Sequence, residues 1–156
     1  MKLLVINGPN LNTLGEREPA IYGTTTLLEV VQGLRELAGQ GHAIADFQSN
    51  HEGAIIDFLQ EQADADGAIM NPGGLAHTSI VLRDAVAACG FPVVEVHISD
   101  IGTREEFRHH SYLADVTARQ VIGKGVAGYE EALRWLLDNA RVRFPNASDE
   151  ARGGRT

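Results

Sequence analysis

Cysteine, lysine and long apolar runs are all scarce in this sequence. Cys89 stands alone among 156 residues, so no intramolecular disulfide can form, and no second thiol is available for a zinc site. No apolar stretch approaches the length of a membrane span, and the first one, residues 3–6, is too short for a signal peptide. We therefore expect a cytoplasmic protein without a membrane partner.

Basic residues are also fewer than acidic residues. Thirteen Lys and Arg face 21 Asp and Glu, a formal net charge of −8, which disfavours nucleic acid as a partner because its phosphates would be repelled. An apolar fraction of 44% is ordinary for a single domain of this length. We predict one catalytic domain over residues 1–144 and a disordered polar tail over residues 145–156.

Short apolar runs alternate with helical patterns along the chain. The runs, typical of strands buried on both faces, are residues 3–6, 43–47, 68–70, 93–96 and 121–122. Between and after them, apolar residues with helical spacing form four stripes: Leu27, Val30, Val31, Leu34 and Leu37; Ile55, Phe58, Leu59 and Gln62; Val81, Ala85 and Ala88; and Tyr129, Leu133, Leu136, Leu137 and Ala140. Tyr129 and Trp135 are expected in the core.

This alternation predicts an α/β fold of the flavodoxin-like, doubly wound type. Right-handed crossovers give a five-stranded parallel sheet of order 2-1-3-4-5 with helices on both faces. In that order the first, third and fourth strands are neighbours. Ligands bind such sheets at the carboxyl ends of the strands, where the strand order reverses.

Polar segments follow or finish those three strands. They are Asn7-Gly8-Pro9-Asn10, Asn71-Pro72-Gly73-Gly74 and Glu95-Val96-His97-Ile98-Ser99. The first two could be turn chemistry alone, and Thr78 or Ser79 after the second is expected to cap a helix. A free helix N-terminus beside an Asn-rich turn nevertheless favours an anionic group such as a carboxylate.

His97 and Glu95 lie two residues apart, hence on the same face of the fourth expected strand. A carboxylate there can hold the imidazole and favour its protonated form, as a general acid requires. The alternative is a solvent-facing ion pair. Glu95 lies within a strongly apolar strand, however, where a carboxylate without a partner is costly.

The loop over residues 14–23 is long for a connection between a strand and a helix, and glycines near its ends suggest a mobile lid. Arg17 and Tyr22 are its chemically unusual groups. A guanidinium close to a phenol favours the phenolate, which could act as a base. The alternative is that Tyr22 packs over the sheet while Arg17 is solvated.

The same fold can serve other functions, but this sequence lacks the residues that they need. A phosphoryl-receiving module would want acidic residues at the strand ends to hold Mg²⁺, where this chain has Asn7, Asn10 and Asn71. An FMN site would want a phosphate loop, but Pro9 lacks a backbone donor. A Ser-His hydrolase built on Ser99 and His97 lacks the Gly-x-Ser-x-Gly elbow.

The remaining histidines do not have metal-ligand spacing. There is no His-Glu-x-x-His or Cys/His pattern, so we expect no metal. His51 is expected to begin the second helix, and the adjacent His109 and His110 are expected at the surface or an interface.

Taken together, six ordered motifs closely resemble the type II 3-dehydroquinate dehydratases over about residues 3–140. The motifs are Asn7-Gly8-Pro9-Asn10-Leu11-Asn12, Gly15-x-Arg17-Glu18-x-x-x-Tyr22-Gly23, Phe47-Gln48-Ser49-Asn50-His51-Glu52-Gly53, Asn71-Pro72-Gly73-Gly74-x-x-His77-Thr78-Ser79, Glu95-Val96-His97-Ile98-Ser99 and residues 104–112. The resemblance implies a cofactor-free dehydration of 3-dehydroquinate to 3-dehydroshikimate, in the shikimate or quinate pathway.

The resemblance also implies roles for matched residues. Tyr22 would be the base that removes the proton next to the ketone, with Arg17 sustaining its anionic form. Asn10 would stabilise the enolate through an ordered water. His97, oriented by Glu95, would protonate the departing hydroxyl.

Substrate binding is implied for another group of positions. Asn71 and the backbone N–H groups of Ile98 and Ser99 would hold the carboxylate, while His77 and Arg108 would fix the ring hydroxyls. The resemblance further implies a dodecamer of four trimers, in which Asp84 reaches the site of a neighbouring subunit.

The sequence departs from the pattern of the family at two positions. Asp100 and Gly102 stand where many relatives carry Asn and His, which puts an extra negative charge near a site for an anion.

The unrelated type I dehydratases use a lysine Schiff base, but Lys2 lies at the wrong end of the first expected strand and Lys124 follows the fifth. Neither lysine is expected beside His97.

Overall fold

The apolar runs form the five strands of one parallel sheet in a computed structural model that describes residues 1–140. The strands are β1 (Lys2–Asn7), β2 (Ala43–Gln48), β3 (Gly67–Asn71), β4 (Val93–His97) and β5 (Arg119–Ile122). Their order is β2-β1-β3-β4-β5, which confirms the predicted topology. Asn7 of β1 is paired in register with Asn71 of β3, so the polar strand ends meet at one edge.

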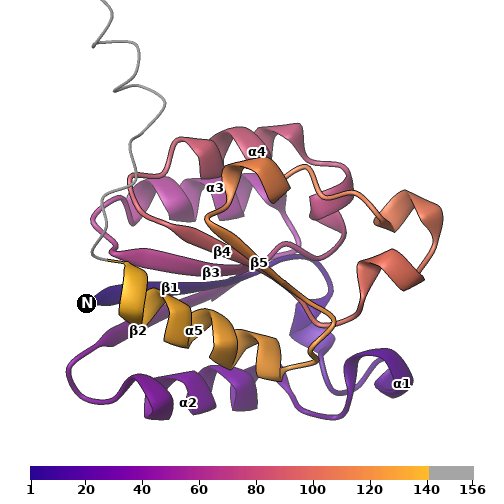
Figure 1. Ribbon diagram of the computed structural model, residues 1–156, viewed down its shortest axis with the longest axis horizontal. Coiled ribbons are helices and arrows are strands. Elements are labelled where there is room, and N and C mark those ends of the chain that lie inside the picture. Colours follow the sequence, from indigo (N-terminus) through magenta and orange to yellow (C-terminus); the bar gives the residue numbers. More distant parts are fainter. Residues whose placement is uncertain (141–156) are drawn as a thin grey trace, which may run out of the picture.

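Helices cover both faces of the sheet (Figure 1). One face packs against α2 (Leu27–Ala38) and α5 (Ala127–Asn139), the other against α3 (Glu52–Glu61) and α4 (Ile80–Ala87). Each face has its own apolar core, because alternate strand residues point to opposite sides. Tyr129 and Leu133 of α5 are fully buried in the first core, and Trp135 packs against it.

The edge strands differ from the expectation of burial on both faces. That expectation holds for β1, β3 and β4, but every residue of β2 is at least partly exposed, and Arg119 and Gln120 of β5 are incompletely buried. The predicted order already places β2 and β5 at the edges of the sheet, and an edge strand has a neighbour on only one side, so its side chains are covered less than those of a central strand.

The buried face of α4 also differs from the predicted stripe. Leu82 and Val86 face the core, whereas Val81 is 51% exposed. The helix begins one residue after Ser79, whose hydroxyl accepts a hydrogen bond from Leu82 N and thereby caps it, as expected. His51 precedes α3 as its N-cap residue, as predicted. The error lay in the choice of face, because Val81, Leu82 and Ala85 are all apolar.

The segment that connects β1 with α2 contains more structure than the predicted loop. A four-residue helix, α1 (Pro19–Tyr22), lies within it and carries Tyr22 at its end. Gly15 and Gly23, on either side of this helix, have φ angles of 89° and 77°, a region that glycine adopts without strain. Gly8 is required for a different reason: a Cβ there would lie 2.3 Å from the carbonyl oxygen of Pro72.

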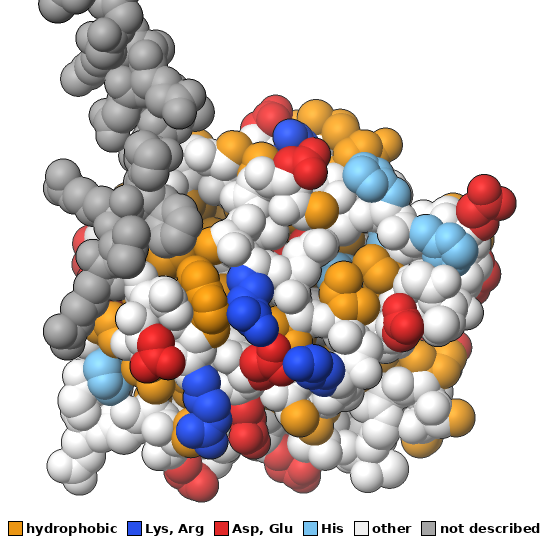
Figure 2. Space-filling view, in the orientation of Figure 1, with side chains coloured by type: hydrophobic (Ala, Val, Ile, Leu, Met, Phe, Trp, Pro, Cys, Tyr) orange, Lys and Arg blue, Asp and Glu red, His pale blue; other side chains and the backbone are white. Residues whose placement is uncertain are grey.

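Surface charge is mixed on the face in view in Figure 2, where basic and acidic side chains lie beside one another. Arg119 and Lys124, for example, both contact Glu131 of α5. Within residues 1–140, no helix is long and apolar enough to cross a membrane. The predicted domain boundary at residue 144 and the predicted tail lie outside the described residues.

Candidate active site

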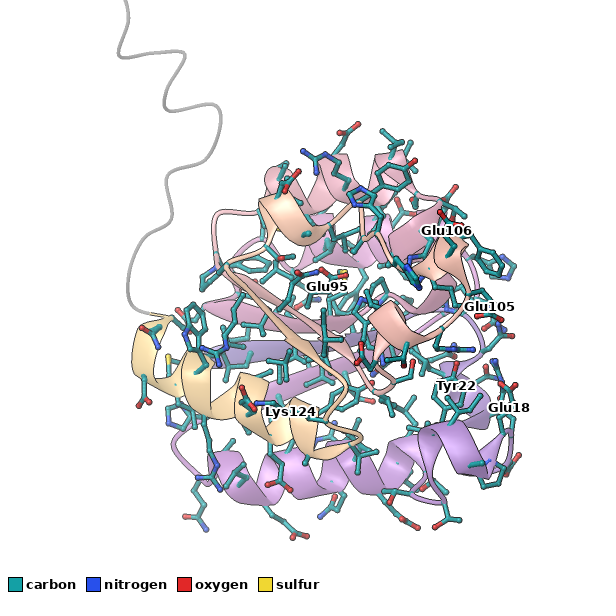
Figure 3. The ribbon with its side chains drawn as sticks, turned by 45° about the vertical axis from the view of Figure 1, so that its right-hand side comes forward. Glu18, Tyr22, Glu95, Glu105, Glu106 and Lys124 are labelled. Carbon is teal, nitrogen blue, oxygen red and sulfur yellow. The ribbon has the colours of Figure 1, made fainter. Side chains whose placement is uncertain are left out.

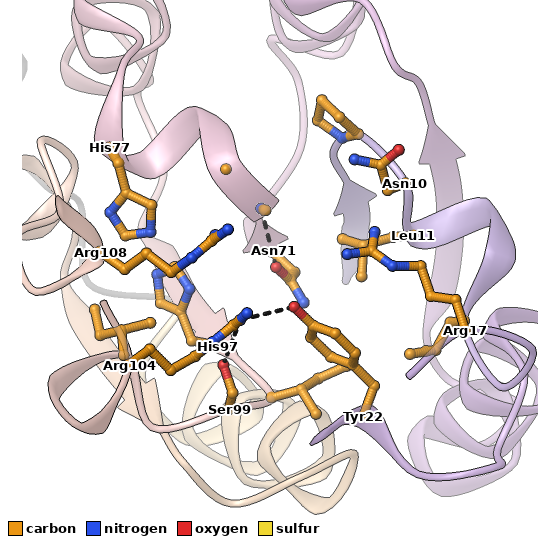
Figure 4. Close-up of a pocket in the computed structure, with 16 residues that line it drawn as sticks. Asn10, Leu11, Arg17, Tyr22, Asn71, His77, His97, Ser99, Arg104 and Arg108 are labelled. Carbon is orange, nitrogen blue, oxygen red and sulfur yellow. Dashed lines mark hydrogen bonds between the residues drawn. The ribbon is translucent and has the colours of Figure 1, made fainter. Parts of the chain in front are cut away.

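A cavity of about 180 Å³ lies at the carboxyl edge of the sheet, between α1 and the ends of β3 and β4 (Figure 4). Most of the predicted site residues line it together: Asn10, Arg17, Tyr22, Asn71, His77, His97, Ile98, Ser99 and Arg108. They come from chain segments up to 98 residues apart. Glu95 lies behind His97 and is completely buried.

Tyr22 is held by an arginine other than the one predicted. Arg104 Nη1 donates a hydrogen bond of 2.8 Å to the Tyr22 hydroxyl oxygen and contacts Ser99 Oγ at 3.4 Å (Figure 4). Arg17 lies against the ring, its Cζ 5.3 Å from the centroid, while its guanidinium pairs with Glu18. Two guanidinium groups therefore contact Tyr22, one at its hydroxyl oxygen and one over its ring.

His97 and Glu95 form a buried pair. His97 Nε2 donates to Glu95 Oε1 over 2.7 Å, and the two side chains are 6% and 0% exposed. Burial raises the pKa of Glu95, but hydrogen bonding and charge attraction from His97, with hydrogen bonds from Ser111 and Gln120, hold that pKa below its ordinary value. Because Nε2 is committed to Glu95, Nδ1 is the ring nitrogen left for a ligand.

His77 lies beside His97, with ring centroids 6.2 Å apart. Its Nδ1 is 2.7 Å from the carbonyl oxygen of His110, and since a carbonyl can only accept, this nitrogen carries a hydrogen. Burial lowers the pKa of His77, which favours a neutral ring whose Nε2 accepts hydrogen bonds. Arg108 lies near it and is anchored by Glu105 at 2.9 Å.

The floor of the cavity is fixed by a buried polar network. Tyr129 Oη donates to Asn7 Oδ1 at 2.6 Å and accepts from Asn71 Nδ2 at 2.9 Å. Asn71 Oδ1 also accepts from the backbone N–H of Gly73. Burial raises the pKa of Tyr129, so this hydroxyl stays protonated and serves as a structural donor. The hydrogen bond from Asn71 Nδ2 to Tyr129 of α5 thereby fixes the orientation of the Asn71 side chain.

Asn10 is held in an unusual backbone conformation. Its φ of 69° is left-handed, a region that Asn tolerates better than most residues, and its backbone N–H donates to Asn50 Oδ1 at 2.9 Å. Gln48 Nε2 donates to Gly8 O and to the same Asn50 oxygen. The end of β2 thus sets the loop that carries Asn10.

The cavity is electropositive in an acidic protein. Arg17, Arg104 and Arg108 line it, and no Asp or Glu does so among residues 1–140. The formal charge of the whole chain is −8, so three arginines concentrated at one opening distinguish it from the rest of the surface. The arrangement suits a small anion, since several donors and positive charges converge on the cavity, while the carboxylates that pair with the arginines, Glu18 and Glu105, lie outside its lining.

Two acidic residues noted in the sequence do not face this cavity. Asp100 Oδ1 accepts a hydrogen bond from Gly102 N, so its carboxylate closes the turn that contains both substituted positions. Asp84 is exposed on α4 and, within the described part of the chain, is not among the residues lining the cavity. Its predicted role concerns a neighbouring subunit.

The lysines are also remote from the cavity. Lys2 pairs with Asp64, and Lys124 pairs with Glu131 of α5, as expected from their places in the sequence. Figure 3 shows Lys124 beside α5, Glu95 inside the molecule, and Tyr22 at the edge that also carries Glu105. Residues 1–140 contain no cluster of three or more His, Cys, Asp or Glu placed to hold a metal ion.

Sequence reasoning missed four polar residues that support the site: Arg104, Ser111, Gln120 and Tyr129. Arg104 and Ser111 lie in the motif over residues 104–112, but nothing in their spacing identifies Tyr22 and Glu95 as their partners. Tyr129 was placed correctly in the core, while the need of a buried hydroxyl for hydrogen-bond partners was the available signal of its network.

Fold and site together define a flavodoxin-like α/β protein in which Tyr22, His97 and three arginines line one cavity at the carboxyl edge of the sheet. Residues 1–137 match the family model described as "Dehydroquinase class II". The chain belongs to the class II dehydroquinase family.

Its relatives share nearly its whole length. It is 50% identical to a 3-dehydroquinate dehydratase of Roseiflexus castenholzii, over 99% of each chain. It is 48% identical to "Catabolic 3-dehydroquinase 1" of Neosartorya fischeri, over 90% of this chain and 95% of that protein. The crystal structure of type II dehydroquinase from Butyrivibrio crossotus covers 88% of this chain and 97% of its own, at 45% identity and a TM-score of 0.85.

Proposed function

We propose that this chain dehydrates 3-dehydroquinate to 3-dehydroshikimate without a cofactor, through an enolate. The observation that carries the proposal is that Tyr22 and His97 line one cavity from different elements, α1 and the end of β4. The elimination needs a base for the proton next to the ketone and an acid for the departing hydroxyl. Membership of the family supports the choice of substrate.

Tyr22 is the base in this mechanism. The hydrogen bond from Arg104 Nη1 to its hydroxyl oxygen supports a phenolate, because a guanidinium stabilises the charge that the oxygen gains. Arg17, packed on the ring, adds a second positive charge. The phenolate takes the proton from the carbon next to the ketone and becomes a neutral phenol.

Negative charge then develops on the ketone oxygen of the substrate. Asn10, on the opposite side of the cavity from His77 in Figure 4, has a side-chain amide that can donate towards this oxygen, directly or through a water molecule. The restraint of its loop by Asn50 supports this role, because a preorganised donor costs little reorganisation during the reaction.

His97 is the acid. Its Nδ1 delivers a proton to the hydroxyl that leaves as water, and the carbon–carbon double bond forms as the enolate collapses. Glu95 stabilises the imidazolium beforehand through its bond to Nε2. At the end of the cycle Tyr22 holds one extra proton and His97 lacks one, so a proton returns from one to the other through water.

Substrate binding uses the remaining lining residues. Asn71, with the backbone N–H groups of Ile98 and Ser99, would hold the carboxylate of the substrate. His77 and Arg108 would bind ring hydroxyls, and the neutral form favoured for His77 is suited to accept from a hydroxyl. The three lining arginines support the preference for an anion.

Assembly is part of the proposal. Asp84 is exposed on α4, where it is available to a neighbouring subunit. A dodecamer of four trimers, as implied by the resemblance, would let Asp84 complete an adjacent cavity. Mass measurement in solution, with Asp84→Asn as a variant, tests whether assembly and activity depend on this residue.

The direct test is to mix the protein with 3-dehydroquinate and follow the ultraviolet absorbance of the conjugated enone carboxylate. Tyr22→Phe and His97→Ala should each lower turnover by at least about 10²-fold while remaining folded, as expected for loss of a general base or acid. Retention of full rate by Tyr22→Phe would show that the base is misassigned.

Borohydride separates this mechanism from a Schiff base. With substrate present, Lys2 and Lys124 should stay unmodified, because both are paired with carboxylates away from the cavity. A substrate adduct on either lysine, detected by mass spectrometry, would contradict the enolate mechanism.

A further inference from the structure

The strand register places Gln120 directly beside Glu95. The two are Cα partners across β4 and β5, so their side chains project from the same face of the sheet. Gln120 Nε2 donates to Glu95 Oε2 over 2.7 Å, whereas Oε1 accepts from His97 and Ser111. Both oxygens of the fully buried carboxylate therefore have a donor.

A buried Glu–His pair has two ways to hold one proton. It can be an ion pair, with an imidazolium and a carboxylate, or a neutral pair, with the proton on the carboxyl. Burial alone favours the neutral pair, because separated charges are poorly solvated there. Donors on the carboxylate favour the ion pair, because an ionised oxygen accepts more strongly than a protonated one.

We propose that Gln120 is a positioning residue for the acid step: by donating to Oε2, it fixes the plane of the Glu95 carboxylate and keeps the proton of the pair on His97. The inference deepens the proposed function and rests on it, since the proton held on His97 is the one delivered to the leaving hydroxyl. Gln120 does not line the substrate cavity among the described residues.

Few groups near the Glu95–His97 pair could donate a hydrogen bond to the Glu95 carboxylate in place of Gln120. On the other side of Glu95, β3 contributes the apolar Met70. The other titratable and charged side chains that line the cavity with His97 are Arg17, Tyr22, His77, Arg104 and Arg108, and the ring centroid of His77 lies 6.2 Å from that of His97.

On the outer side of the pair, Gln120 and Ser111 line a separate hollow with Asp100, His109 and His110. Gln120 thus lies between the buried carboxylate and these outer titratable groups. The pKa of Glu95 is held below its ordinary value in part by Gln120 and Ser111, which agrees with an ionised Glu95.

The test is nuclear magnetic resonance of the ligand-free protein, which reports the site of the proton directly. At pH 7 the wild type should show a carboxylate ¹³C signal for Glu95 and ¹⁵N signals of an imidazolium for His97. In Gln120→Met, which keeps the length of the side chain but removes the donor, the populations should shift towards a protonated carboxyl and a neutral ring. A matched control is Gln32→Met, which removes an exposed Gln–Glu hydrogen bond on α2.

Kinetics provide the second readout. Gln120→Met should lower kcat on the order of tenfold with KM nearly unchanged, because a charged hydrogen bond that supports the acid is lost while substrate contacts stay. Unchanged Glu95 and His97 signals together with unchanged kcat would overturn the proposal, as would a protonated Glu95 in the wild type at pH 7.

Gln120→Glu covers the case in which the Met variant does not fold. Two adjacent carboxylates should share a proton near neutral pH, which would appear as one protonated carboxyl signal; two ionised carboxylates beside an unchanged His97 would overturn the proposal. Failure of the wild type to convert 3-dehydroquinate would instead refute the proposed function, while the spectra would still decide where the proton lies.

Discussion

The two sides of the cavity are built in different ways. The proposed acid, His97, lies at the end of a central strand, and its partner Glu95 is fully buried with donors from three residues. The proposed base, Tyr22, lies at the end of a four-residue helix and is only partly buried. Its hydroxyl depends on one hydrogen bond, from Arg104, a residue 82 positions away.

The difference shows which parts of the fold fix the positions of the two proposed catalytic side chains. The acid side inherits its position from the sheet, so its geometry is as stable as the core. The base side lies outside the sheet: Tyr22 packs on the edge of the first apolar core and its hydroxyl is held by Arg104 from another loop. Substitutions on the base side should therefore affect catalysis more than stability, and substitutions on the acid side should affect both.

The largest effect that isolates the base side is expected for Arg104→Met. Loss of a charged donor to the Tyr22 oxygen should lower kcat by about 10²-fold, comparable to removal of one donor to a developing anion. The free energy of unfolding should fall by no more than about 1 kcal/mol, since the side chain is 17% exposed and loses hydrogen bonds but lies outside the apolar cores. Steady-state kinetics and urea unfolding measure the two effects.

Arg35→Met is the matched control, because Arg35 forms an ion pair with Asp46 on the α2 side of the molecule. It should leave kcat unchanged. If Arg104→Met instead costs stability without lowering kcat, the distinction between the two sides is wrong.

On the acid side, the stability contributed by Glu95 should depend on pH. Its pKa is lower in the folded protein than the ordinary value of 4.5, so its ionised form stabilises the fold. That contribution is complete above about pH 4.5 and is lost as the pH falls through the lower pKa of the folded state. At pH 7 the free energy of unfolding of the wild type should exceed that of Glu95→Gln by about 1–3 kcal/mol. At pH 3 this difference should be smaller.

Urea unfolding of both proteins at the two pH values measures that difference. A difference that stays constant would mean that the Glu95 carboxyl is not stabilised in its ionised form, and the acid side would then lack its proposed anchor.

A smaller effect is expected at the floor of the cavity. Tyr129→Phe keeps the ring in the core but leaves Asn7 Oδ1 and Asn71 Nδ2 without the hydroxyl between them. The free energy of unfolding should fall by about 1–2 kcal/mol, since buried polar groups lose a partner. KM should rise a few-fold as Asn71 loses its restraint, and unchanged stability and KM would show that the network is dispensable.

The sequence predicted the sheet well because the central strands are short apolar runs, interrupted inside only by Glu95 of β4. It predicted less where composition is uniform: Val81 and Leu82 are equally apolar, so the face of α4 was misjudged. The predicted order placed β2 at the edge correctly, but its apolar run gave no sign that all of its residues would stay partly exposed.

For the site, the strand ends sufficed to predict which loops converge. Hydrogen bonds between distant segments could not be predicted from the sequence. The contact between Arg104 and Tyr22, for example, depends on how two loops fold over the sheet. The pairing of Gln120 with Glu95 depends on a register that no local pattern encodes. Polar residues on the last strand and helix therefore remained unassigned.

The most direct test of the two-sided mechanism is deuterium incorporation into 3-dehydroquinate recovered from D₂O. With the acid removed, His97→Ala should still form the enolate, so deuterium should appear at the carbon next to the ketone. Tyr22→Phe should leave that carbon unlabelled. Equal labelling by both variants would contradict the assignment of Tyr22 as the base and His97 as the acid.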